Sequence, residues 1–139
     1  MTSELRVTDH ATPAEEKAIS ERLQAYSNKN FGTSDRQELA IILYDAMGNP
    51  EGGLIGRTAR GWLYVQMLFV PGHRRGQGLA SRMLQMAERE AKIRGCLGSY
   101  LDTMSPQALG LYRKQGYEII GQLEDLAGGH TISWLKKRF

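Results

Sequence analysis

Residues 62–80 read WLYVQMLFVPGHRRGQGLA, an apolar run followed by a loop rich in glycine and arginine. Trp62 to Val70 is the longest and most apolar strand candidate in the chain. Beyond the loop, apolar residues recur at the spacing of one helix face, and Gly95 ends that helix. The residues of this face are Leu79, Met83, Met86, Ala87 and Ala91. The segment therefore predicts a strand, a tight loop and a helix in direct succession.

Upstream of this segment the sequence predicts one helix and two strands. Thr12 and Pro13 form a helix start, because threonine caps well and proline suits the first helical position. Leu39–Ala46 and Leu54–Thr58 are strand candidates, and the glycine-rich turn between them predicts an antiparallel hairpin. The apolar positions that follow the helix start at helical spacing are Ile19, Leu23 and Tyr26.

Downstream, the sequence predicts three more strands and one more helix. Ser105 and Pro106 begin the helix, which ends at Gly116. The strands are expected over Cys96–Thr103, Tyr117–Leu123 and Thr131–Leu135. In the earlier helix that ends at Gly95, the pairs Glu88–Lys92 and Glu90–Arg94 are expected on the solvated side.

This order of helix, three strands, helix, strand, helix and two strands predicts an α/β fold. We expect a single domain over residues 1–139, with a mixed, largely antiparallel sheet flanked by helices. One helical crossover joins the strands that begin at Trp62 and Cys96. A chain of 139 residues with 41% apolar residues is long enough to bury one core.

The composition excludes several classes of protein. No apolar stretch reaches the roughly 20 residues that span a bilayer, and the first residues lack the apolar run of a secretory signal. Cys96 is the single cysteine, and His10, His73 and His130 are scattered, so the clustered ligands of a structural zinc site are missing. We therefore expect a cytoplasmic protein without an internal disulfide or a metal.

Charge is divided unevenly along the chain. Residues 1–72 carry seven basic and nine acidic side chains, whereas residues 73–139 carry eleven and six. The basic excess lies in the half that contains the glycine-rich loop, but it is too small for a nucleic-acid surface. A small polyanionic ligand fits this distribution better, and neither nucleic acid nor a membrane is expected as a partner.

The loop from Arg74 to Gly78 is a candidate phosphate cradle. Its glycines allow the backbone to approach a ligand closely, and free N–H groups at the start of a helix attract negative charge. Arg74 and Arg75 can add charge-assisted hydrogen bonds. An ordinary turn with solvated arginines is the alternative. The Walker pattern does not apply, because no lysine followed by serine or threonine comes after the glycines.

A dinucleotide-binding loop is a further alternative. Gly76 and Gly78 precede a helix, and Asp102 lies near the end of the next strand, where a ribose-binding acid is expected. However, Ser81 occupies the third glycine position, and antiparallel hairpins do not precede the loop in a nucleotide-binding βαβ unit.

The sequence RGQGLA at residues 75–80 resembles the Arg/Gln-x-x-Gly-x-Gly/Ala signature of the GNAT superfamily of N-acetyltransferases. Residues 62–70 resemble the central strand of that family, and residues 101–103 and 108–117 resemble its later strand and helix. The resemblance extends from about Leu39 to Leu135. It implies a GNAT-like acyl-CoA N-acyltransferase fold with acetyl-CoA as cosubstrate.

The resemblance also implies which residues bind acetyl-CoA. Main-chain groups of Leu68 and Val70 would receive the pantetheine arm, and the loop would surround the pyrophosphate. Gln107, where many relatives carry asparagine, is expected at the pantetheine, with an ordinary first-turn polar residue as the alternative. The loop residues of the expected site are Arg75, Gly76, Gln77, Gly78, Leu79, Ala80 and Ser81.

Tyr112 stands where the family has its general acid. A tyrosine of pKa about 10 can protonate a departing thiolate without prior ionisation; packing in the core is the alternative role. The base is not identified, because Trp62–Val70 contains no acid where many relatives carry glutamate, and Gln66 cannot accept a proton. His73 is expected at the surface and Asp102 as a structural acid, so a water relay or an already neutral substrate would serve.

These observations predict an N-acetyltransferase that transfers the acetyl group of acetyl-CoA to a primary amine of a small molecule or peptide by direct attack. Trp62 and Tyr64 are candidates for lining the acceptor site, with a core role as the alternative. A non-catalytic CoA-binding module of the same fold and a nucleotide-dependent redox protein are the competing functions. Dimerisation is common in the superfamily, so a homodimer is expected by fold analogy.

Overall fold

The computed structural model describes residues 3–139, and the chain forms two compact units with their boundary in the sequence between Ser34 and Asp35. The first unit contains one helix, α1 (Pro13–Phe31), which begins as the sequence predicts. Thr12 Oγ1 accepts the Glu15 N–H at 3.1 Å, and the Thr12 N–H donates to Glu15 Oε1 at 2.8 Å, a reciprocal cap. The single domain over residues 1–139 stays a prediction.

The apolar positions of α1 do not form a buried face. Ile19 is 67% exposed and Leu23 is 62% exposed, and no residue of the helix is buried. Their helical spacing therefore predicts the helix but not a packing surface within the described residues. Among residues 3–139, no helix is both long enough and apolar enough to cross a membrane.

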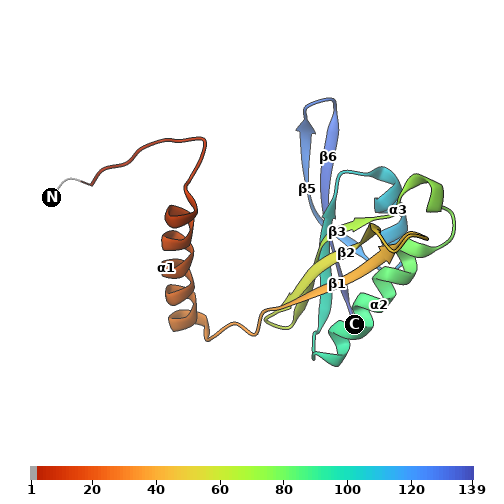
Figure 1. Cartoon of the computed structure of the whole chain (residues 1–139), viewed down its shortest axis with the longest axis horizontal. Helices are drawn as coiled ribbons and strands as arrows, with labels where there is room; N and C mark the ends of the chain where they lie inside the picture. The colour runs from red at the N-terminus through yellow and green to blue at the C-terminus, as the bar shows by residue number, and fades with distance from the viewer. Residues whose placement is uncertain (1–2) are drawn as a thin grey trace. The chain divides into compact units, whose positions relative to one another are not determined.

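The second unit is built on one six-stranded sheet (Figure 1). The strands lie in the spatial order β1-β2-β3-β4-β6-β5, and only the β3–β4 pair is parallel. The sheet is therefore mixed and largely antiparallel, as predicted. The strands are β1 (Gln37–Tyr44), β2 (Pro50–Ala59), β3 (Trp62–Phe69), β4 (Gly98–Thr103), β5 (Glu118–Leu126) and β6 (His130–Arg138).

Three helical segments join these strands: the short 3₁₀ turn η1 (Gly72–Arg74), then α2 (Leu79–Ile93) and α3 (Pro106–Lys114). The helix α2 makes the predicted crossover between the two parallel strands. The cap of α3 is also as predicted, because Ser105 Oγ accepts the Ala108 N–H at 3.1 Å. The strand expected from Cys96 begins only at Gly98, since the Cys96 N–H still bonds to the Ala91 carbonyl and so closes the end of α2.

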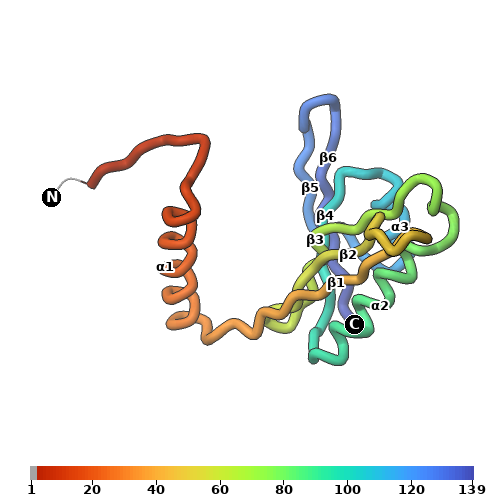
Figure 2. The backbone as a smooth tube through the Cα atoms, viewed as in Figure 1, coloured from red at the N-terminus to blue at the C-terminus, as the bar shows by residue number. Residues whose placement is uncertain are grey.

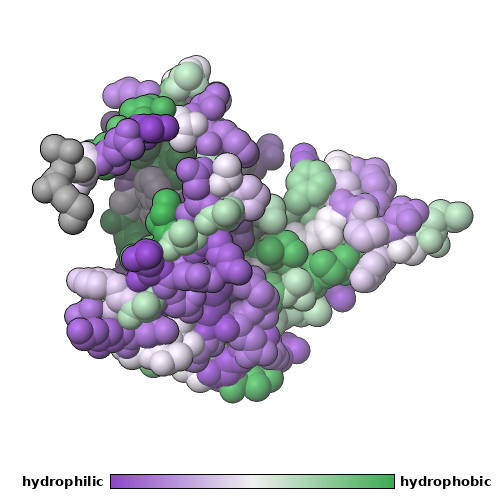
Figure 3. All heavy atoms as spheres, turned by 60° about the vertical axis from the view of Figure 1, so that its left-hand side comes forward, coloured by the Kyte–Doolittle hydropathy of each residue, from purple (hydrophilic) through white to green (hydrophobic). Residues whose placement is uncertain are grey.

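The hydrophobic core lies between the sheet and its two helices, which cover the same face of the sheet in Figure 1. Alternate residues of each strand point to this face. Figure 3 shows a largely hydrophilic surface on which hydrophobic residues appear in separate groups. The largest fully buried apolar side chains are Leu54, Leu63, Leu84, Leu101 and Leu135.

One charged residue belongs to this core, contrary to the sequence prediction. Glu88 was expected to pair with Lys92 on the solvated side of α2, but it is only 4% exposed. Its carboxylate accepts the Tyr117 hydroxyl at 3.0 Å and Lys137 Nζ at 2.7 Å. The prediction failed because Glu88 lies on the helix face that packs on the sheet, where Lys137 of β6 and Tyr117, just before β5, supply its partners. The second predicted pair, Glu90 with Arg94, is present at 3.1 Å.

The β5–β6 hairpin projects beyond the other strands (Figure 2). Every residue of β5 except Leu126 is exposed, so this edge contributes little to the core. Both strands are longer than predicted, because β5 continues to a tight turn before His130 and β6 continues to Arg138, where it pairs with β4.

Candidate active site

The parallel strands β3 and β4 part at one end of the sheet. Their register runs from Trp62 opposite Gly98 to Val65 opposite Leu101 and stops there, although β3 continues to Phe69. A bulge marks the place: Ile55 of β2 pairs with Met67, whereas the next residue pairs with Val65. Gln66 is therefore one extra residue in β3. Because a bulge bends its strand, it turns the end of β3 away from β4.

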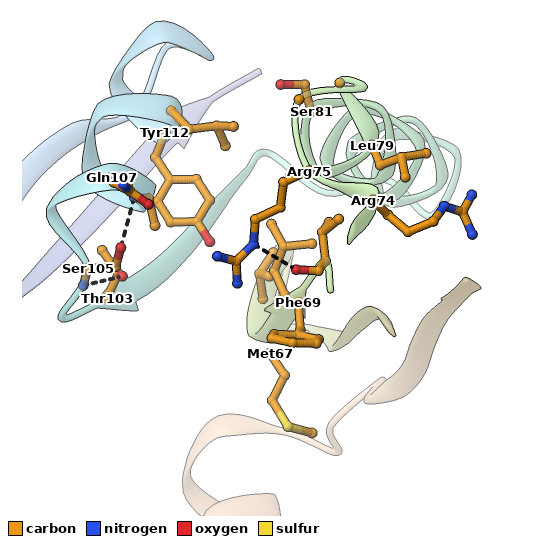
Figure 4. A pocket seen from close by; sticks show the side chains of 18 of the residues that line it. Met67, Phe69, Arg74, Arg75, Leu79, Ser81, Thr103, Ser105, Gln107 and Tyr112 are labelled. Carbon is orange, nitrogen blue, oxygen red and sulfur yellow. Dashed lines mark hydrogen bonds between the residues drawn. The ribbon is translucent and has the colours of Figure 1, made fainter. Parts of the chain in front are cut away.

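A cavity of about 830 Å³ fills the opening between the parted strands. It is bordered by the end of β3, the glycine-rich loop, the start of α2, the end of β4 and one side of α3. In the close view of Figure 4, Tyr112 of α3 and Arg75 of the loop approach each other across it. The expected site residues that line it are Leu68, Val70, Arg75, Gly76, Gly78, Leu79, Ala80, Ser81, Gln107 and Tyr112.

The loop presents unused backbone N–H groups to this cavity. Gly76 and Gly78 have φ angles of 78° and 72°, the left-handed conformation that glycine adopts most easily. A Cβ atom added to either glycine would meet nothing within 4 Å, so the space above the loop is open. The first backbone bond of α2 is from the Arg82 N–H to the Gly78 carbonyl. The preceding amides of α2 therefore point outward at the positive end of a helix dipole.

The two arginines of the loop have different roles. Arg74 Nη1 bonds to Glu51 Oε1 at 2.8 Å and to the Tyr44 carbonyl at 3.3 Å, so it holds the loop against β1 and β2. Arg75 Nε donates to the Val70 carbonyl at 3.1 Å. In Figure 4 the Arg75 side chain points into the cavity, whereas Arg74 points away from it. Both arginines line the cavity, but only Arg75 directs its guanidinium into it.

Tyr112 combines a buried ring with an accessible hydroxyl. The residue is 6% exposed, and its ring lies 6.0 Å from that of Tyr117. Its hydroxyl has no hydrogen-bond partner among residues 3–139 and faces the cavity in Figure 4. Burial, together with the charge of Asp102, raises the pKa of Tyr112, so this phenol keeps its proton at neutral pH.

One predicted site residue, Gln77, lies outside the cavity, and His73, which was expected at the surface, lies outside it as well. Gln77 does not line the cavity, although its neighbours on both sides do. His73 Nε2 lies 3.3 Å from Glu51 Oε2, next to the Arg74 bond, and does not line the cavity either. Gln66, at the bulge, does line it. The cavity therefore contains an amide where a strand carboxylate is common among relatives.

Asp102 lies at the opening and was not assigned to the site by the sequence. It follows directly after Leu101, the last residue of β4 that pairs with β3, and lines the cavity together with Tyr112. Its Oδ1 accepts the Tyr64 hydroxyl at 2.9 Å. Sequence patterns miss this contact because the two residues are 38 positions apart and meet only through the parallel pairing of β3 with β4.

A mixed sheet with one parted parallel seam, and a glycine-rich loop opening a helix beside it, defines the acyl-CoA N-acyltransferase fold. The family model described as an acetyltransferase (GNAT) domain matches residues 35–119 of the chain. The chain therefore belongs to the GNAT family of acetyltransferases, as the sequence resemblance predicts.

The similar proteins are also acetyltransferases by name. Acetyltransferase Atu2258 of Agrobacterium fabrum is 50% identical over 133 residues, which cover 96% of this chain and 97% of that protein. Blasticidin-S acetyltransferase of Streptomyces morookaense is 38% identical over 91 residues, covering 65% of this chain and 67% of that one.

Solved structures confirm the fold. A crystal structure assigned as an acetyltransferase from Agrobacterium tumefaciens superposes with a TM-score of 0.96 at 49% identity, over 99% of this chain and 100% of the other. A structure assigned as a streptothricin acetyltransferase from Bacillus anthracis, solved in complex with acetyl coenzyme A, gives a TM-score of 0.64 at 18% identity. It covers 73% of this chain and 62% of that one.

Proposed function

We propose that the protein is an acetyl-CoA-dependent N-acetyltransferase that acetylates a primary amine of a small molecule or peptide by direct attack. One observation carries the proposal: a single cavity joins a helix-opening glycine loop, which suits a diphosphate, to a buried tyrosine with a free hydroxyl. An anion-binding loop and a proton donor are the two parts that transfer from a CoA thioester requires.

The residues of the loop fit a pyrophosphate. The amides of Gly76, Gly78 and the first residues of α2 would donate to its oxygens, and Arg75 would add a charge-assisted bond. Leu68 and Val70 would offer main-chain groups to the pantetheine arm, although the Val70 carbonyl already accepts Arg75 Nε. When bound, acetyl-CoA supplies an activated acetyl group on a thiol that leaves readily.

Tyr112 would protonate the departing thiolate. Its raised pKa keeps it in the protonated form that a general acid needs. The acceptor must be neutral to attack, and an alkyl amine of pKa about 10.4 is mostly protonated at pH 7, which costs roughly 4–5 kcal/mol. A group or an environment that removes this proton is therefore also needed.

The comparisons give the proposal its support but leave the acceptor open. One relative is named for acetylating blasticidin S, and a distant protein of the same fold holds acetyl coenzyme A. A small amine is therefore the first acceptor class to test. The homodimer and the cytoplasmic location stay predictions of the sequence.

The test is a release assay for free CoA thiol over an amine panel, with acetyl-CoA affinity measured separately by calorimetry. The panel contains blasticidin S, spermidine, free lysine and a lysine-containing peptide. We expect turnover with at least one amine and saturable binding of acetyl-CoA. Absence of acetyl-CoA binding would contradict the proposal.

Two glycine variants test the loop assignment. Gly78→Val places a branched side chain at φ 72° in the cradle, and we expect acetyl-CoA affinity to fall about a hundredfold or more, because several charge-assisted bonds are lost. Gly48→Val is the matched control, since it adds the same side chain at a similar φ of 83°, in open space outside the cavity. Equal affinities in folded proteins would remove the cradle assignment.

A non-catalytic CoA-binding module is the second candidate. The presence of Gln66 at the bulge, where no carboxylate is available on β3, is the observation that favours it. Saturable acetyl-CoA binding without thiol release over the whole panel would establish the module in place of the enzyme.

A further inference from the structure

We propose that Asp102 of β4 binds the acceptor ammonium and removes its proton, and that Tyr64 positions the Asp102 carboxylate for this step. The inference rests on the proposed acetyltransferase function and identifies a base that β3 does not supply. In this assignment Asp102 is a catalytic residue and Tyr64 is a positioning residue.

The topology places Asp102 at the right point of the seam. Pairing of β3 with β4 ends at Val65 and Leu101, so Asp102 is the first residue of β4 that no longer pairs with β3. It is exposed and lines the same cavity as Tyr112 and the loop. A carboxylate here lies where the cavity opens between the strands and can meet an amine entering from solvent.

Asp102 and Tyr112 lie on opposite sides of the sheet opening. Leu101 is buried against the helices, so the alternation of β4 turns Asp102 to the other face, together with Tyr100. Tyr112 belongs to α3, which packs on the helix-covered face. An acyl group held between the strands would therefore have a proton acceptor on one side and a proton donor on the other.

Tyr64 fixes the carboxylate in this position. Its hydroxyl donates to Asp102 Oδ1 at 2.9 Å, which leaves Oδ2 for a substrate. The Tyr64 ring is itself held on two sides. Tyr100 stacks on it at 4.9 Å, and the Arg57 guanidinium lies 4.7 Å from its centre. A donor so constrained restricts the rotation of the Asp102 side chain.

The charges around Asp102 are compatible with an anionic carboxylate that binds a cation. Tyr64 from β3 and Tyr112 from α3 are protonated at neutral pH, and burial raises the pKa of both. The Arg57 guanidinium of β2 lies over the Tyr64 ring. Lys136 of β6 pairs with Tyr100 in the sheet, and its Nζ lies 4.0 Å from Glu118 Oε1. Trp134, which pairs with Asp102, has no charge.

The proposed step balances as follows. Asp102 takes one proton from the ammonium, and the neutral amine attacks the thioester carbonyl, so that a carbon–nitrogen bond forms and the carbon–sulfur bond breaks. The departing thiolate receives a proton from Tyr112. The second proton lost from the amine nitrogen restores Tyr112, and the proton on Asp102 passes to solvent. The products are the acetamide, CoA thiol and one proton.

The test compares the dependence of kcat/KM on pH in wild type and Asp102→Asn, using the panel amine that turns over fastest and saturating acetyl-CoA. We expect Asp102→Asn to reduce kcat/KM about a hundredfold at pH 7. The deficit should shrink as pH approaches the pKa of the amine, where the substrate is neutral without help. Acetyl-CoA affinity, measured by calorimetry, should be unchanged.

Tyr64→Phe tests the positioning role. We expect a fall in kcat of about tenfold, a shift of the acid limb of the pH profile to higher pH, and an unchanged KM for acetyl-CoA. Tyr100→Phe is the matched control, because it keeps the stacked ring and removes a hydroxyl that does not bond to Asp102.

The outcomes separate this inference from the proposed function. Wild-type protein that binds acetyl-CoA but acetylates no amine overturns both. Wild-type turnover with an Asp102→Asn variant within threefold at pH 7 overturns the role of Asp102 alone. An equal loss at every pH, accompanied by lost acetyl-CoA binding, also overturns it, because it indicates a structural defect.

Discussion

Tyr112 and Tyr117 have rings 6.0 Å apart, yet their hydroxyls belong to two different regions of the molecule. Tyr117 lies in the closed region, where its hydroxyl bonds to Glu88, which Lys137 also binds. Tyr112 lies in the open region, where its hydroxyl faces a cavity. In the closed region, Tyr117, Glu88 and Lys137 bond to one another. In the open region, the loop amides, the Tyr112 phenol and the Asp102 carboxylate line the cavity and are available to a ligand. Changes in the first should therefore affect stability, and changes in the second should affect chemistry.

The largest expected effect is on catalysis in the open region. Tyr112→Phe removes the proposed proton donor and keeps the ring, so we expect kcat to fall about 10²–10⁴-fold with little change in acetyl-CoA affinity. Steady-state kinetics and calorimetry measure the two quantities. Tyr117→Phe is the control, since it should leave kcat near the wild-type value. Wild-type rates in Tyr112→Phe would show that the hydroxyl is dispensable.

The next effect is on stability in the closed region. Glu88→Ala leaves Lys137 and the Tyr117 hydroxyl without their shared acceptor, and breaking this partly buried pair costs up to about 3–5 kcal/mol. Urea unfolding measures this loss. Glu88→Gln keeps the shape and one acceptor oxygen and should lose less. A loss below about 1 kcal/mol in Glu88→Ala would mean that the network does not stabilise the fold.

The two loop arginines give a smaller contrast within the open region. Arg75→Ala removes a guanidinium directed into the cavity and should raise the Kd for acetyl-CoA about 10- to 100-fold, as expected for one charge-assisted bond. Arg74→Ala removes the bonds to Glu51 and to the Tyr44 carbonyl and should raise the Kd a few-fold. Calorimetry at two salt concentrations distinguishes them, because the direct contact is more sensitive to screening. Equal increases in Kd for the two variants would show that the two arginines do not differ in their role.

The smallest effect concerns the pH dependence of stability in the closed region. Burial, with the charge of Glu88, raises the pKa of Tyr117 far above its usual value. The folded protein thus keeps a proton that the unfolded chain loses above about pH 10, so this contribution is complete below pH 10 and declines as pH rises.

Between pH 9 and pH 11, we expect wild-type protein to lose about 1 kcal/mol more stability than Tyr117→Phe, which has no such proton. Unfolding curves at the two pH values measure the difference. The other buried tyrosine, Tyr112, titrates in both proteins and cancels. Parallel declines in the two proteins would contradict the assignment.

The fold was largely predictable from sequence because its signals are local. Caps at Thr12 and Ser105, the apolar run of β3 and the glycine loop each specify an element without reference to distant residues. The burial of Glu88 could also have been predicted from the sequence, since Glu88 lies four residues after Leu84 and one after Ala87, on the buried face of α2.

The features that the sequence did not predict depend on strand pairing. The bulge at Gln66 exists only in the register of β3 against β2, and the Tyr64–Asp102 bond requires β3 and β4 to be neighbours. Neither has a sequence signature of its own, because register is set by the partner strand. Gln77 illustrates a related limit: a motif gives the order of residues but not which of them line the cavity.

The bulge at Gln66 also has a consequence for how such a pocket originates. A strand without this extra residue would keep the same register with β2 throughout, and nothing would bend its end away from β4. We therefore expect that deleting Gln66 would let β3 and β4 pair further and close the gap between them. In this protein the length of one strand, more than the chemistry of its side chains, determines that there is room for a substrate.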